Sequence, residues 1–113
     1  MTIDVEKRSG VTVLHIKGEI ASHDGDAIAE EATTVLEQGT GGIGIVIDLA
    51  EVPFINSAGL GSLVNVVAQA NTHEQRVILA SPSPHIEGVL QATKLDQFFE
   101  TCPTLDDAVN RLR

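Results

Sequence analysis

The chain has 113 residues with a formal net charge of −9, and 42% of its residues are hydrophobic. This length and composition predict one domain spanning residues 1–113, with a core large enough to need no disulfide or metal. The acidic balance disfavours nucleic acid and anionic membrane surfaces as partners, and the single cysteine excludes an internal disulfide.

Alternating apolar residues at positions 3–5 and 11–17, separated by Ser9-Gly10, predict a β-hairpin whose second strand ends at Gly18. Cap-type residues at 22–25 then precede apolar residues at helical spacing up to Leu36. We therefore expect a helix that ends at the glycine-rich run 39–42. The β-branched run 43–49 predicts a central strand covered on both faces, which is typical of parallel pairing. Pro53 then requires a turn or an edge-like segment.

A second helix is expected to begin with Asn56 or Ser57 as its cap, because apolar residues continue at helical spacing from Leu60. The run 76–80 predicts another buried strand, and residues 86–95 a shorter helical face. Phe98 and Phe99 stand where a last short strand fits, and residues 104–112 predict a capped terminal helix. The order β-β-α-β-α-β-α-(β)-α indicates an α/β fold: a mixed, mostly parallel sheet of four to five strands with about four helices.

Signals for catalysis, cofactors or membrane association are weak. The run 39–44 matches G-x-G-x-x-G but follows a helix and leads into a strand, the reverse of the dinucleotide motif. The histidines have no metal-ligand spacing, and no serine lies in a nucleophile elbow. We expect no enzymatic activity, no cofactor and no metal. The chain starts without a signal peptide and has no apolar run of ~20 residues, so a cytoplasmic protein without membrane insertion is expected.

Ser57 is the main candidate for a functional residue. A hydroxyl at a helix start, directly after a buried strand, lies at the carboxyl edge of the sheet, where α/β folds gather their sites. A phosphate there would meet the unpaired amides of the first turn and would add about −1.5 to −2 charges. Such a charge favours release of a bound partner. The residues alone also allow a simple capping role worth about 1 kcal/mol.

The run I-D-L-A-E-V-P-F-I-N-S-A-G-L-G at residues 47–61 resembles the signature of the STAS family, the anti-sigma-factor antagonists. Members of that family carry D-L-x-x-V-x-F-(I/M)-D-S-(S/T)-G-L-G after a buried strand. Gly18-Glu19-Ile20 and Ala80-Ser81-Pro82 are similar to further marks of the family, so the resemblance covers essentially the whole chain. It implies a STAS-type domain that regulates transcription by binding a partner protein.

The resemblance also implies how the protein is switched. In the family, the serine corresponding to Ser57 is phosphorylated by a serine kinase that is itself the anti-sigma factor. The unphosphorylated antagonist binds that kinase and releases the sigma factor, and a serine phosphatase resets the system. The partner-binding surface implied for this chain comprises Phe54, Asn56, Ser57, Ala58, Gly59 and Leu60, with a possible adjacent loop of Ala21, Ser22, His23 and Asp24. Among the histidines, His23 belongs to a turn that could face Ser57.

The chain departs from the family pattern beside the serine. Asn56 stands where the family has an aspartate, Ala21 replaces an acidic residue, and Ala58 lacks the usual hydroxyl. If those carboxylates help to recruit or orient the kinase and its metal–nucleotide, phosphorylation of Ser57 is expected to be slow or absent. The alternative function is then a STAS adaptor or scaffold subunit, in a signalling complex or beside a lipid transporter, that binds without phosphorylation.

Overall fold

The computed structural model describes residues 1–21, 23–37 and 43–113, so Ser22 and the glycine-rich run 39–42 lie outside the described residues. Five strands form one sheet in the spatial order β1-β2-β3-β4-β5. Their bounds are Thr2–Arg8, Val11–Lys17, Gly44–Glu51, Arg76–Ala80 and Glu100–Cys102. β1 pairs antiparallel with β2, and every later pairing is parallel. The predicted mixed, mostly parallel sheet is confirmed.

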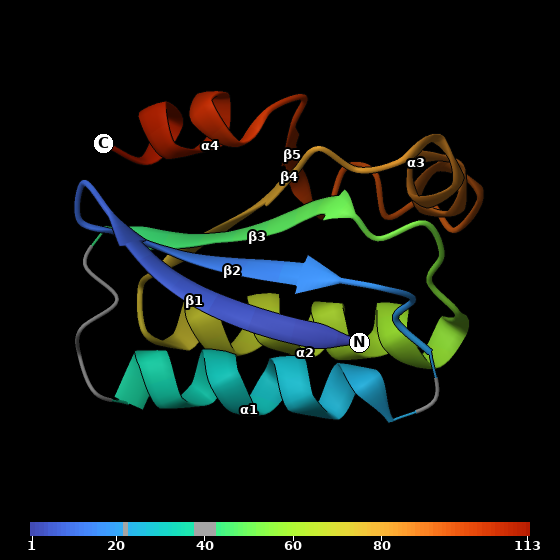
Figure 1. Cartoon of the computed structure of the whole chain (residues 1–113), viewed down its shortest axis with the longest axis horizontal. Helices are drawn as coiled ribbons and strands as arrows, with labels where there is room; N and C mark the ends of the chain where they lie inside the picture. The colour runs from blue at the N-terminus through green and yellow to red at the C-terminus, as the bar shows by residue number, and fades with distance from the viewer. Residues whose placement is uncertain (22, 38–42) are drawn as a thin grey trace.

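The helices cover both faces of this sheet (Figure 1). They are α1 (Asp24–Glu37), α2 (Ser57–Thr72), α3 (Pro84–Ala92) and α4 (Leu105–Leu112). α1 and α2 run side by side across one face, and α4 lies on the opposite face. α3 lies beyond the ends toward which β2 and β3 point. The predicted order of strands and helices is therefore confirmed.

Alternation along the strands divides the apolar side chains between two cores. Leu14 and Ile47 pair in register and point toward α1 and α2, whereas their neighbours Val13 and Val46 pack against α4. Both central strands are thus buried on both faces. This is why the sequence of β3 reads as a nearly continuous apolar run.

The last strand differs from the prediction. β5 is Glu100–Cys102, and Phe98 and Phe99 precede it in a turn in which both amides donate to the Leu95 carbonyl at 3.0 Å. Phe99 is buried in the larger core, so its aromatic ring contributes to packing and not to strand pairing. Leu95 likewise lies beyond α3, which ends at Ala92.

Candidate functional site at the start of helix α2

A short backbone bridge holds together the two loops that were predicted to form the site. Ile20 follows β2 and forms an isolated parallel bridge with Ile55, which follows β3. The Ile20 amide donates to the Phe54 carbonyl at 3.0 Å, and the Asn56 amide donates to the Ile20 carbonyl at 3.1 Å. The loop that enters α1 and the loop that enters α2 therefore adjoin at the carboxyl edge of the sheet (Figure 1).

Asn56, not Ser57, caps α2. Asn56 has an extended backbone, and its Oδ1 accepts a hydrogen bond from the Gly59 amide at 2.9 Å. Ser57 is the first residue of the helix, and its side chain is exposed. Its hydroxyl has no hydrogen bond to the residues that the structure describes. The two capping possibilities of the sequence are thus resolved, and the Ser57 hydroxyl has no structural role in this helix start.

The start of α2 is also electrostatically distinct. Among the helices of the described chain, α2 alone has no acidic residue in its first turn; the others carry Asp24 and Asp26 in α1, Glu87 in α3, and Asp106 and Asp107 in α4. The amides of Ser57 and Ala58 have no acceptor within the described chain. The positive end of the helix dipole is therefore not neutralised by a side chain, and this arrangement favours an anion at Ser57.

The other residues of the predicted surface lie at different depths. Phe54 and Ala58 are exposed and Asn56 is half-buried, whereas Gly59 and Leu60 are buried. Gly59 lies against the Ile20 segment, and a Cβ atom there would lie 2.7 Å from Ile20 Cγ2 and 2.8 Å from the Ile20 carbonyl oxygen. Gly59 and Leu60 therefore pack beneath the loop and position it, whereas Phe54, Ser57 and Ala58 are exposed to solvent.

In the adjacent loop, the Asp24 carboxylate forms a hydrogen bond within the loop itself. The Ala21 amide donates to Asp24 Oδ2 at 3.1 Å, and the Asp24 amide donates back to the Ala21 carbonyl at 3.0 Å. This reciprocal pair fixes the start of α1. The His23 side chain is 97% exposed and lies 3.5 Å from the Asp26 carboxylate. Within the described residues no hydrogen bond or ion pair joins His23 to Ser57, so the structure does not bring these two side chains together.

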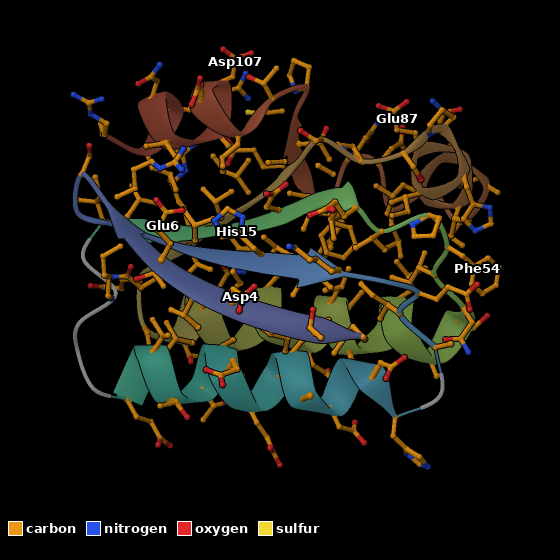
Figure 2. The ribbon with its side chains drawn as sticks, viewed as in Figure 1. Asp4, Glu6, His15, Phe54, Glu87 and Asp107 are labelled. Carbon is orange, nitrogen blue, oxygen red and sulfur yellow. The ribbon has the colours of Figure 1, made fainter. Side chains whose placement is uncertain are left out.

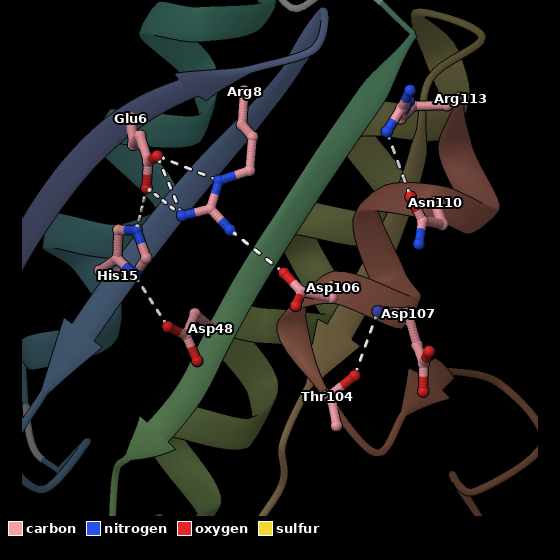
Figure 3. Close-up of polar contacts among 9 residues, drawn as sticks. All are labelled: Glu6, Arg8, His15, Asp48, Thr104, Asp106, Asp107, Asn110 and Arg113. Atoms are coloured by element: carbon pink, nitrogen blue, oxygen red, sulfur yellow. Dashed lines mark hydrogen bonds and ion pairs between the residues drawn. The ribbon is translucent and has the colours of Figure 1, made fainter.

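A second polar cluster, which sequence reasoning missed, lies on the sheet face that carries α4 (Figure 3). His15 Nε2 lies 2.7 Å from Glu6 Oε1, and His15 Nδ1 lies 2.7 Å from Asp48 Oδ2. Glu6 also accepts from Arg8 at 3.1 Å, and Arg8 lies 3.6 Å from Asp106 of α4. We call these five residues the His15 network. The parallel register that pairs His15 with Asp48 is the signal that would have located it.

The His15 network favours the charged imidazole. A neutral imidazole donates from one nitrogen only, so both carboxylates receive a donor only when His15 is protonated. Partial burial by itself lowers the pKa of His15, but the hydrogen bonds to Glu6 and Asp48 outweigh this and raise it above its usual 6.5. The hydrogen bonds from His15 and Arg8 in turn lower the pKa of Glu6 below its usual 4.5.

The described residues offer no support for a metal site, a membrane-spanning helix or a reactive thiol. Its histidine, cysteine, aspartate and glutamate side chains form no group of three that could hold a metal ion. None of the helices described here has the length and apolar character needed to cross a membrane. Burial raises the pKa of Cys102, the opposite of what a reactive thiol requires.

The model of the STAS domain family matches residues 2–108, and the chain therefore belongs to this family. Several solved structures are similar over nearly the whole chain. An anti-sigma factor antagonist from Mycobacterium paratuberculosis is 29% identical with a TM-score of 0.86, covering 99% of this chain and 93% of that one. An anti-sigma-factor antagonist (STAS) domain protein from Planctomyces limnophilus is 23% identical with a TM-score of 0.83, covering 98% and 97%.

The Bacillus cell fate determinant SpoIIAA in its phosphorylated form is 24% identical with a TM-score of 0.75, and the match covers 99% of this chain and 100% of that one. At this level of identity the likeness establishes the fold. The predicted STAS-type fold is confirmed by the family match and by these structures together.

Proposed function

We propose that this protein is an anti-sigma-factor antagonist whose switch is Ser57. In its unphosphorylated form it binds an anti-sigma factor that is also a serine kinase, and this binding releases a sigma factor. Phosphorylation of Ser57 ends the binding, and a serine phosphatase restores it. The protein performs no catalysis of its own. The observation that carries the proposal is the exposed Ser57 hydroxyl at a helix start that has no acidic residue and is capped by Asn56.

The geometry supports a switch that acts by charge and not by refolding. A phosphate on Ser57 would lie beside the first-turn amides of α2, which stabilise an anion without any change in the helix. It would add about −1.5 to −2 charges to an edge that already carries Glu51 and Asp26. The kinase brings the phosphates of its own nucleotide to Ser57, so a phosphate on Ser57 meets a second anion in the complex, and this repulsion weakens binding.

Substitution of Ser57 tests this proposal. We expect Ser57→Asp to weaken binding to the anti-sigma kinase about tenfold or more, because it introduces a charge into the interface. Ser57→Ala should bind like the parent, since Asn56 provides the cap. Ser9→Asp is the matched control, because it adds the same charge to an exposed hairpin serine at the far end of the sheet. Titration calorimetry measures the affinities; equal affinity of Ser57→Asp and the parent contradicts the proposal.

One observation favours a second function, the STAS adaptor or scaffold that binds without phosphorylation. The polar groups flanking Ser57 are already engaged: the Asn56 amide group caps α2, and the Asp24 carboxylate fixes the start of α1. The Asn56 amide is uncharged and the Asp24 carboxylate is engaged, so neither offers a free carboxylate oxygen to orient the metal–nucleotide of a kinase. Asn56→Asp separates the two functions, because the added carboxylate should accelerate phosphorylation of a switch and leave an adaptor unphosphorylated.

A further inference from the structure

Two aromatic rings from different loops are stacked beside the Ser57 site. The rings of Phe54 and His85 have centroids 4.9 Å apart and an interplanar angle of 28°. Phe54 precedes Ser57 by three residues and is 40% exposed, and His85 is exposed in the first turn of α3. Figure 2 shows Phe54 at the outer end of the molecule, away from the sheet. We call these two residues the Phe54–His85 pair.

The pair is held in place by anchored neighbours on both sides. Phe54 is followed by Ile55, which is buried and bridged to Ile20. On the other side, Ser83 caps α3 by accepting a hydrogen bond from the Ile86 amide at 3.2 Å, and Ile86 is buried in the larger core. Each ring thus projects from a fixed backbone. A rigid aromatic group loses little conformational entropy on binding, which is the property of residues that dominate interfaces.

The surroundings of the pair are acidic. Glu19 and Glu51 are exposed at the same edge of the sheet, and the Lys17 ammonium lies 3.6 Å from the Glu51 carboxylate. The four arginines lie toward the opposite end, in the β1–β2 hairpin, at the start of β4 and at the end of α4; they are Arg8, Arg76, Arg111 and Arg113. An exposed apolar centre with an acidic rim is complementary to a basic patch on a partner protein.

We propose that the Phe54–His85 pair is the apolar anchor of the partner surface and that it binds a basic patch on the anti-sigma factor. This inference rests on the proposed function and deepens it, because it adds α3 to a surface that the sequence placed only on the loops before α1 and α2 and on the first residues of those helices. An arginine or lysine of the partner packs on the exposed ring face, and the exposed carboxylates of this edge, Glu19 and Glu51, complement its charge.

The test measures the affinity of the purified anti-sigma kinases of the source genome for single variants. Phe54→Ala should weaken binding about tenfold or more, and His85→Ala about three- to tenfold, as expected for a central ring and its support. Phe98→Ala is the matched control and should stay within about twofold, typical of a residue outside an interface. Phe98 is 44% exposed, and its ring meets the Phe99 ring edge-to-face with centroids 5.1 Å apart. It therefore resembles Phe54 in exposure and ring contact, but it lies in the turn before β5, outside the proposed surface.

A second pair of variants tests the basic character of the partner. Glu19→Gln, next to the Ile20 amide that bonds the Phe54 carbonyl, should slow association and reduce its dependence on salt. Glu30→Gln, at an exposed residue of α1, should change neither. Circular dichroism of each variant confirms that it is folded, and His85→Ala provides a test in which no buried group is removed.

The outcomes separate this inference from the proposed function. Parent-like affinity of both Phe54→Ala and His85→Ala, while Ser57→Asp still weakens binding, overturns the inference and leaves the proposed function standing. If the parent protein binds none of the anti-sigma kinases, both are overturned. Loss of affinity in Phe98→Ala equal to that in Phe54→Ala also overturns the inference, because the effect then does not depend on position.

Discussion

The start of α2 and the His15 network are two polar regions that differ in whether their polar groups have partners within the protein. In the His15 network every charged group has a partner: His15 lies between Glu6 and Asp48, and Glu6 also binds Arg8. At the start of α2, the Ser57 hydroxyl and the amides of Ser57 and Ala58 have no partner among the described residues. A closed network contributes to folding, whereas an open helix start is available for binding. Changes in the two regions should therefore affect different properties.

The largest effect on stability is expected at Gly59, whose contact with Ile20 positions the start of α2. Gly59→Ala places a methyl group 2.8 Å from the Ile20 carbonyl oxygen, so the loop or the helix must shift, at a cost of about 1–3 kcal/mol. Gly61→Ala, two residues along the same helix, meets no atom within 4 Å and should stabilise by about 0.5–1 kcal/mol. Urea unfolding measures both. Equal stabilities for the two variants would show that the contact with Ile20 does not position α2.

A smaller effect is expected from the cap. Asn56→Ala should reduce the free energy of unfolding by about 1 kcal/mol, because the Gly59 amide loses its acceptor. Thr104→Ala in α4, where Thr104 Oγ1 accepts from the Asp107 amide at 3.1 Å, should cost a similar amount. Asn56→Asp should retain stability, since a carboxylate both caps and suits the helix dipole. An unchanged free energy in Asn56→Ala would mean that Ser57 replaces it as the cap.

The smallest effect on stability is expected from the His15 network. The His15 side chain is 24% exposed, and solvent weakens the ion pairs that it forms. The pKa of His15 is raised, so its contribution to stability is complete below pH 6.5 and is lost as the pH rises through the folded-state pKa. The pKa of Glu6 is lowered, so its contribution is complete above pH 4.5 and is lost as the pH falls. The network therefore stabilises most between these two values.

Replacement of His15 tests this pH dependence. In His15→Gln, the decline in thermal midpoint between pH 6 and pH 8.5 should become shallower, because the titrating group is absent. His73→Gln, at the exposed end of α2, should keep the decline of the parent. An identical pH profile in His15→Gln and the parent would contradict the closed network.

The sequence predicted the order of strands and helices because hydrophobic periodicity is a local property. Contacts between distant residues were not predictable in this way. His15 hydrogen-bonds to Asp48, which is 33 residues away in the sequence. Phe54 stacks on His85 because the loop after β4 brings the start of α3 beside it. The cap of α2 stayed open between Asn56 and Ser57 because both side chains accept from a helix amide, and only geometry decides between them. Phe98 and Phe99 were assigned to a strand because aromatic propensity does not distinguish a strand from a core anchor.

The most direct test of the central claim is the intact mass of the protein after incubation with each purified anti-sigma kinase and Mg-ATP. We predict a gain of one phosphate, absent in Ser57→Ala, with no loss of helical content because the start of α2 accepts an anion. A kinase that binds the protein yet transfers no phosphate to it would contradict the switch and leave the unphosphorylated STAS adaptor as the function.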